Sequence, residues 1–230
     1  MPHATQLAFR RSPRGAWVLL SAALLCLANC GCSYLLLVGL LVGGPPNIEP
    51  AFEVETKESF TDKDVTVAVV CFAPDKVRYS FEDIDQELAK HVAYRLHEHD
   101  IKVIMPQRVK EWLDQNRDWD RPEEIGEAFK CTYVVYIDLN DFTLFEEGST
   151  TLYRGSSEAI VNVYKMDSTD GTGEKIFSRE KISKFPKLRP RAASEQSYNT
   201  FKAEYLSQLS NEIGQFFYEY YIADELIDQG

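Results

Sequence analysis

The longest uncharged run of the sequence contains residues 16–44, a stretch of 29 consecutive residues without a charge. It follows three arginines: Arg10, Arg11 and Arg14. A helix of about 20 apolar residues crosses a bilayer, and basic residues beside such a helix tend to stay on the cytoplasmic side. We therefore predict that residues 1–44 are a signal peptide or a membrane anchor. The chain beyond Pro45 should then lie on the periplasmic or exoplasmic side of the membrane.

The type of anchor stays open, because two signals overlap. The segment Leu27-Ala28-Asn29-Cys30-Gly31-Cys32 resembles the lipobox of bacterial lipoproteins, so Cys30 and Cys32 are lipidation candidates. Asn29 departs from that pattern, directly before Cys30 and three positions before Cys32. The apolar residues 34–42 continue past both cysteines, which an uncleaved transmembrane helix explains better. A lipoprotein and a transmembrane anchor therefore both fit, and a released, secreted protein fits less well.

After the apolar run we expect a linker and one acidic domain. Residues 45–63 contain three prolines and are mostly polar, which predicts an extended linker, and residues 64–230 are long enough for one domain with its own core. Beyond residue 44 the chain holds 22 basic and 36 acidic side chains, a net charge of −14. Because nucleic-acid binding depends on clustered Lys and Arg, we exclude DNA and RNA as main partners.

Apolar periodicity predicts an α/β (α+β) fold with a mixed β-sheet of about five strands and flanking helices. Period-two and continuous apolar runs predict strands, and apolar residues at i, i+4 spacing predict helices. The predicted strands are 65–72, 101–105, 131–139 with a further segment at 142–145, 151–166 and 174–182. The predicted helices are 80–98, 106–112, 122–129 and 198–226. The order is strand, helix, strand, two helices, three strands and a final helix. The run at 65–72 is apolar on both faces, which favours a central strand.

Three segments within residues 64–222 resemble a known group of envelope proteins. They are Val67-Ala68-Val69-Val70-Cys71-Phe72, Ile125-Gly126-Glu127-Ala128-Phe129-Lys130-Cys131-Thr132-Tyr133-Val134-Val135 and Asp170-Gly171-Thr172-Gly173-Glu174-Lys175-Ile176-Phe177. In this arrangement the chain resembles the amino-terminal domain of the Tol-system translocation protein, the curli-secretion lipoprotein and the lipoprotein activators of penicillin-binding proteins. The resemblance implies a bacterial envelope protein that acts through contacts, and it implies no catalytic residue.

No group of residues has the pattern of a catalytic or metal site. His97 and His99 are two positions apart on the helix predicted at 80–98, so their side chains point to different faces. The segment 167–174 lacks both the acidic spacing of a calcium loop and the Gly-Lys-Ser/Thr of a phosphate loop. Cys71 and Cys131 border apolar runs, which predicts two buried thiols. We therefore expect no enzymatic activity, no cofactor and no metal.

Two features are candidate contact surfaces. The first is an acid-free basic stretch: Lys181, Lys184, Lys187, Arg189 and Arg191. It is either a solvated loop or a contact for anionic headgroups, wall polymer or an acidic partner. The second is the aromatic segment 216–221, whose rings exceed one helix face, so some of them are interaction candidates: Phe217, Tyr218 and Tyr221.

These observations predict a membrane-anchored, lipoprotein-like protein of the bacterial envelope whose domain binds other proteins. The alternative is an oligomeric component of an envelope secretion or transport system. The predicted partners are the membrane, through the N-terminal segment, envelope proteins or wall polymer, and further copies of the same chain.

Overall fold

The computed structural model describes residues 47–167 and 171–221. The described residues belong to one compact unit. The predicted membrane segment, with Cys30 and Cys32, lies outside the described residues, so the nature of the anchor stays a prediction. Within the described part of the chain, no helix is long and apolar enough to cross a membrane.

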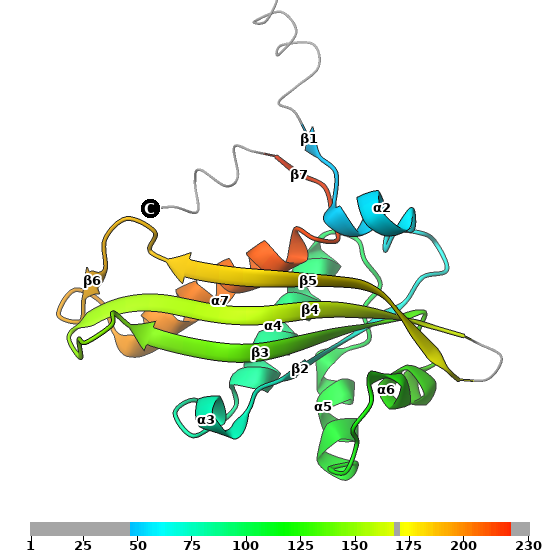
Figure 1. The fold of residues 1–230 in the computed structure, drawn as a ribbon, viewed down its shortest axis with the longest axis horizontal. Coiled ribbons are helices and arrows are strands. Elements are labelled where there is room, and N and C mark those ends of the chain that lie inside the picture. Colours follow the sequence, from blue (N-terminus) through cyan, green and yellow to red (C-terminus); the bar gives the residue numbers. More distant parts are fainter. Residues whose placement is uncertain (1–46, 168–170, 222–230) are drawn as a thin grey trace, which may run out of the picture. The chain divides into compact units, whose positions relative to one another are not determined.

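The centre of the domain is a mixed sheet (Figure 1). Its strands are β2 (Val67–Phe72), β3 (Tyr133–Phe145), β4 (Leu152–Met166), β5 (Gly173–Phe185) and the short β6 (Arg191–Ala192). The strand order is β2-β3-β4-β5, and β6 pairs with β4. Strands β2 and β3 run parallel, and the other pairs are antiparallel. The predicted mixed sheet of five strands with consecutive antiparallel hairpins is therefore confirmed.

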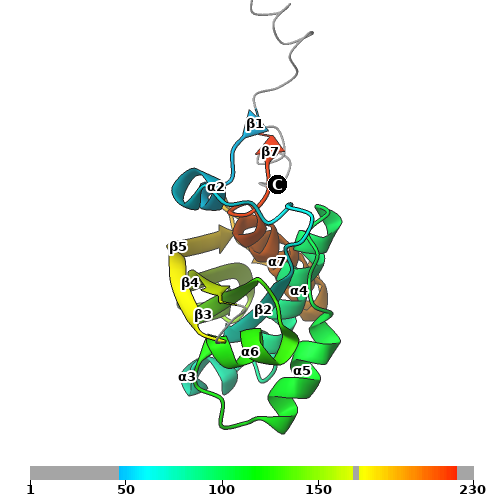
Figure 2. The ribbon, with the colours of Figure 1, turned by 90° about the vertical axis from the view of Figure 1, so that its right-hand side faces the viewer.

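Helices cover the two faces of the sheet unequally (Figure 2). They are α3 (Asp75–Arg78), α4 (Ile84–Glu98), α5 (Pro106–Gln115), α6 (Pro122–Phe129) and α7 (Tyr198–Gly214). Helices α4 and α7 pack on one face, where Val67 and Val69 of β2 enter the main core. Helices α5 and α6 cover the opposite face of β2 and β3, where Val70 and Ile125 belong to a second core. Cys71 and Cys131 are buried free thiols, as predicted.

Strand β2 lies at the edge of the sheet, so the prediction of a central position is wrong. Its two faces are nevertheless buried, because α4 covers one of them and α5 and α6 cover the other. The strand predicted at 101–105 is reduced to one parallel bridge between Val67 and Val103. A run that is apolar on both faces of a strand therefore indicates that both faces are buried, by either strands or helices. In this domain, helices bury both faces of β2.

Helix α7 ends at Gly214, twelve residues before the predicted end at 226. A β-carbon on Gly214 would lie 2.7 Å from the ring of Tyr218, so the chain can fold back over this position because it is a glycine. The aromatic spacing continues beyond the helix end, and periodicity alone could not locate the turn. Beyond the turn, β7 (Tyr220–Tyr221) pairs with β1 (Asn47–Ile48).

The predicted linker 45–63 is also wrong over its described part, because residues 47–63 are folded onto the domain. After β1, the helix α2 (Ala51–Thr56) places Phe52 in the main core, and Phe60 follows it there. Both rings are fully buried, and Phe60 stacks on Phe217 with ring centroids 4.7 Å apart. Pro50 has the extended backbone of a helix N-cap, so this proline introduces a helix and does not indicate an open tether.

Polar contacts attach the same segment to the sheet. The carboxylate of Glu58 accepts hydrogen bonds from the Tyr133 hydroxyl and from the Lys165 ammonium group. Burial acts to raise the pKa of Glu58, but the hydrogen bonds from Lys165 and Tyr133 outweigh it and lower the pKa below its usual value. The domain therefore begins at Asn47, and residues 47–63 contribute both apolar and charged contacts to it.

Candidate functional site

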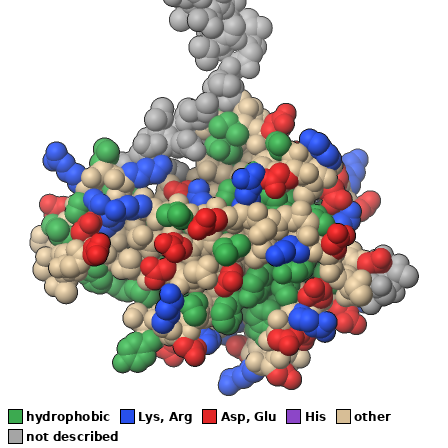
Figure 3. Space-filling view, viewed as in Figure 1, with side chains coloured by type: hydrophobic (Ala, Val, Ile, Leu, Met, Phe, Trp, Pro, Cys, Tyr) green, Lys and Arg blue, Asp and Glu red, His purple; other side chains and the backbone are tan. Residues whose placement is uncertain are grey.

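A cleft of about 1090 Å³ opens beside the edge of the sheet. Its walls are α4 and α5, and its floor is residues 69–72 of β2. Hydrophobic side chains gather over β2 and β3 between α3 and α5 on the face shown in Figure 3, at one side of this cleft. A concave site that combines apolar and polar groups is the usual form of a binding site, so this cleft is the candidate functional site.

The floor of the cleft presents backbone groups without a strand partner. The N–H of Val67 donates to the carbonyl of Lys102 at 2.9 Å, and the carbonyl of Val67 accepts from the N–H of Ile104 at 2.8 Å. In a strand, every second residue directs its backbone N–H and C=O to the same edge. Val69 and Cys71 therefore direct theirs to this edge too, and in residues 47–167 and 171–221 neither has a strand or loop paired with it there.

The segment that pairs with Val67 stops for a local reason. Ile104 is its last residue to bond with β2, and Pro106 begins α5 two residues later. Proline is favoured in the first turn of a helix and has no N–H to offer to a neighbouring strand. The chain consequently leaves the edge of β2 after Ile104, and the rest of that edge becomes the cleft floor.

The apolar wall of the cleft is mainly aromatic. Phe72 is 41% exposed, and the rings of Trp119 and Tyr136 meet edge to face with centroids 6.3 Å apart. Burial raises the pKa of Tyr136 to about 12, so its hydroxyl stays protonated at neutral pH and is available as a donor. This wall can hold apolar or aromatic groups of a partner, because partly exposed aromatic rings are frequent anchors in interfaces.

Part of the polar rim of the cleft is paired within the domain. Arg78 contacts Asp75 at 2.6 Å, and Lys110 contacts Asp114 at 2.7 Å. Burial raises the pKa of the Cys71 thiol well above its usual value, which keeps it protonated and unreactive. Among the described residues, no three His, Cys, Asp or Glu side chains gather as metal ligands. The arrangement suits binding, and we find no nucleophile with an activating base in it.

Two residues of the basic stretch make contacts inside the domain, and the other three are exposed to solvent. The ammonium group of Lys181 lies 3.5 Å from the carboxylate of Glu212 and 5.7 Å from the centre of the Phe216 ring. The guanidinium of Arg191 lies 2.6 Å from the carboxylate of Glu204. The remaining three side chains are exposed to solvent: Lys184, Lys187 and Arg189. Only these three therefore keep the predicted role of a contact patch, because the other two bind α7.

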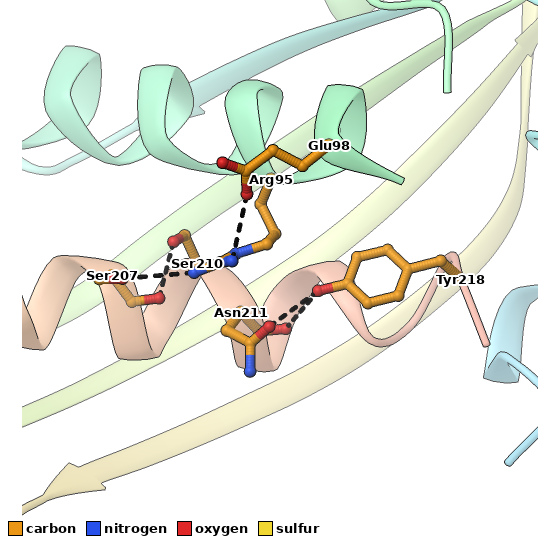
Figure 4. Close-up of polar contacts among 6 residues, drawn as sticks. All are labelled: Arg95, Glu98, Ser207, Ser210, Asn211 and Tyr218. Carbon is orange, nitrogen blue, oxygen red and sulfur yellow. Dashed lines mark hydrogen bonds and ion pairs between the residues drawn. The ribbon is translucent and has the colours of Figure 1, made fainter. Parts of the chain in front are cut away.

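The aromatic candidates divide as well, and two of the three predictions are wrong. Phe217 is fully buried, and Tyr218 is 4% exposed. Figure 4 shows the Tyr218 hydroxyl directed at Asn211 of α7, and it donates to the Oδ1 atom at 2.9 Å. The early end of α7 is the reason, since it turns both rings inward. Tyr221, in β7, is 46% exposed and stays a candidate.

Figure 4 also shows why α4 and α7 form one layer. Arg95 of α4 donates from its guanidinium to the Ser207 hydroxyl of α7 at 3.3 Å, and it contacts Glu98 at 3.1 Å. The Ser210 hydroxyl donates to the Ser207 carbonyl at 2.9 Å. The wall of the cleft that α4 provides is therefore supported from behind by α7, which makes it a firm surface.

The cleft could not be predicted from the sequence, because its residues come from separate segments. Phe72 and Tyr136 are far apart in the chain and are brought close by the parallel pairing of β2 with β3, and Trp119 joins them from the loop between α5 and α6. The available signal was Pro106, which breaks off the strand predicted at 101–105 and so predicts an uncovered edge beside it.

No family model matches the chain, and no curated protein matches it. Similar solved structures include the lipoprotein GNA1162 from Neisseria meningitidis, with 16% identity over 65% of this chain and 97% of that chain and a TM-score of 0.38. They also include a PelC dodecamer from Paraburkholderia phytofirmans, with 8% identity over 75% of this chain and 96% of that chain and a TM-score of 0.43. A third is protein XCC0632 from Xanthomonas campestris, with 11% identity over 67% of this chain and 81% of that chain and a TM-score of 0.38. At these TM-scores the likeness is partial, and no property of these proteins transfers to this chain.

Proposed function

We propose that this chain is a membrane-anchored, lipoprotein-like protein of the bacterial envelope whose domain binds other proteins and catalyses no reaction. The observation that carries the proposal is the cleft between α4 and α5, which combines an uncovered strand edge with an aromatic wall. Both are features that proteins use to hold other polypeptides. The uncharged run at 16–44, led by arginines, supports the membrane location.

An oligomeric component of a secretion or transport system is the second candidate. Strand β5 is 13 residues long and, within the described residues, pairs with β4 alone. An edge of this length without a second strand beside it can pair with another copy of the chain. The charged side chains along β5 act against such pairing, so we rank this candidate second. The mass of the detergent-solubilised protein distinguishes a monomer from an assembly.

A photo-crosslinking experiment in the native envelope tests the first proposal. A benzophenone side chain replaces Phe72, which lines the cleft, and in a matched variant it replaces Tyr79, which is 94% exposed outside the cleft. We expect a defined protein to crosslink at position 72 after illumination and not at position 79. Identical crosslinks at the two positions, or none at position 72, would contradict a protein-binding cleft.

The intact mass of the protein extracted from membranes tests the anchor separately. Loss of the first 29 or 31 residues, with a gain of acyl chains on Cys30 or Cys32, identifies a lipoprotein. A full-length mass identifies a transmembrane anchor. Recovery of the full-length, unacylated protein from the cytosol would refute the proposed location.

A further inference from the structure

We propose that the cleft binds an extended protein segment that joins the sheet as an additional strand beside β2. We further propose that this segment is apolar on one face and carries a lysine or arginine that faces Asp85. The inference rests on the proposed function, because it specifies how a protein would occupy the same cleft. It commits to one occupant: a strand-forming, basic and amphipathic segment of a partner protein.

The backbone of β2 supplies the first argument. Val69 and Cys71 direct two N–H and two C=O groups toward the cleft, and both residues line it. A neighbouring strand satisfies these groups in the geometry that residues 102–104 already use with Val67. A small apolar ligand would leave such backbone groups without partners, which costs free energy when water is excluded.

The walls of the cleft supply the second argument. Successive side chains of an added strand point to opposite faces. One set would meet the aromatic wall, where Phe72 and Trp119 lie, and the other set would meet α4, where Asp85 and Gln86 line the cleft. The two walls differ in polarity, so the segment that fits both must alternate apolar and polar residues.

Charge complementarity supplies the third argument. Asp83 and Asp85 line the cleft at the start of α4, and no ion pair within the described residues engages either carboxylate. The nearby cation, Arg78, is already bound to Asp75. The Gln86 N–H donates to the Asp85 carboxylate at 2.8 Å. Burial nevertheless raises the pKa of Asp85, so an approaching cation would further stabilise the charged carboxylate.

Among the other charges that line the cleft, Lys110, Asp120 and Glu87 have partners inside the domain, and Arg117 is a cation that forms no ion pair with the described residues. Lys110 is paired with Asp114, and the ammonium group of Lys90 lies over the ring of Tyr94 at 5.8 Å from its centre. The chain beyond residue 44 carries a net charge of −14, which favours the approach of a basic segment over an acidic one.

A synthetic octapeptide tests the binding mode on the full-length protein in detergent micelles. The probe alternates valine with lysine, and it is labelled for fluorescence anisotropy. We expect it to bind about tenfold more tightly than the matched peptide that alternates valine with glutamate. Equal binding of the two peptides, or no binding of the valine–lysine peptide at 1 mM or so, would overturn the proposal.

Backbone methylation makes the test specific for strand addition. In an extended peptide, all valine N–H groups point to one edge and all lysine N–H groups to the other. N-methylation of the set that faces β2 should weaken binding at least tenfold, because it removes hydrogen bonds, and methylation of the other set should leave binding unchanged. Equal effects of the two methylations would exclude pairing with the edge of β2.

Two measurements on the protein complete the test. Asp85→Asn should weaken binding of the valine–lysine peptide about threefold and leave binding of a valine–glutamine peptide unchanged. The control Asp100→Asn removes an acid outside the cleft and should leave the binding of both peptides unchanged. Bound peptide should also slow amide exchange at Val69 and Cys71. If crosslinking at position 72 succeeds and these peptide effects are absent, the proposed function stands and the strand-addition mode is wrong.

Discussion

Phe52→Ala tests most directly whether the residues before β2 belong to the domain. The Phe52 side chain is fully buried, and its ring contacts those of Phe60, Tyr133, Phe177 and Phe217 with centroids 4.5 to 5.9 Å away. Replacing a buried phenylalanine by alanine removes its transfer free energy and leaves a cavity among these rings. The expected loss is about 3–5 kcal/mol in the free energy of unfolding.

Urea denaturation of the full chain in detergent, followed by tryptophan fluorescence, measures this loss. With a denaturant slope of about 2 kcal/mol per molar urea, the midpoint should fall by roughly 1.5–2.5 M. The control is Val54→Ala on the same helix, where the side chain is 49% exposed and the change should stay within about 0.5 kcal/mol. If the two variants unfold at the same urea concentration, residues 47–63 belong to the extended linker that was predicted for residues 45–63.

Three further substitutions test other contacts. Tyr205→Phe removes a buried hydroxyl that donates to Ser157 at 2.8 Å, and should lower the free energy of unfolding by about 1–2 kcal/mol in the same assay. Glu58 has a lowered pKa, so the stability that it contributes is complete above about pH 4.5 and is lost as the pH falls through its folded-state pKa. The variant Glu58→Gln should therefore show a weaker dependence of the urea midpoint on pH in that range. Lys181→Ser leaves the buried carboxylate of Glu212 without its cation and should lower the free energy of unfolding by about 1–3 kcal/mol. A urea midpoint equal to that of the unmodified protein would show that Lys181 is available to bind a partner.

Several residues predicted to form contact surfaces make their contacts inside the domain. Among the residues predicted to form contact surfaces, Phe217 and Tyr218 are buried in the core. Lys181 and Arg191 form ion pairs with α7. In each case the contact that the structure shows is with another part of the same chain. Residue type alone does not distinguish an internal partner from an external one.

The sequence by itself determined the elements whose signal is local. Alternating apolar residues predicted the hairpins of β3, β4 and β5, and i, i+4 spacing predicted α4. These patterns are local, because side chains that lie on the same face of a strand or helix recur at a fixed spacing in the sequence. Only the tertiary structure decided which apolar surfaces are covered and by what. Strand β2 lies at an edge, because helices can bury its faces as well as strands can. Residues 47–63 fold onto the domain, because the rings of Phe52 and Phe60 pack against rings more than seventy residues away in the chain, such as those of Tyr133 and Phe217. The cleft follows from both results, because its floor exists only where one segment ends its pairing with β2 and no other segment of the described chain takes its place.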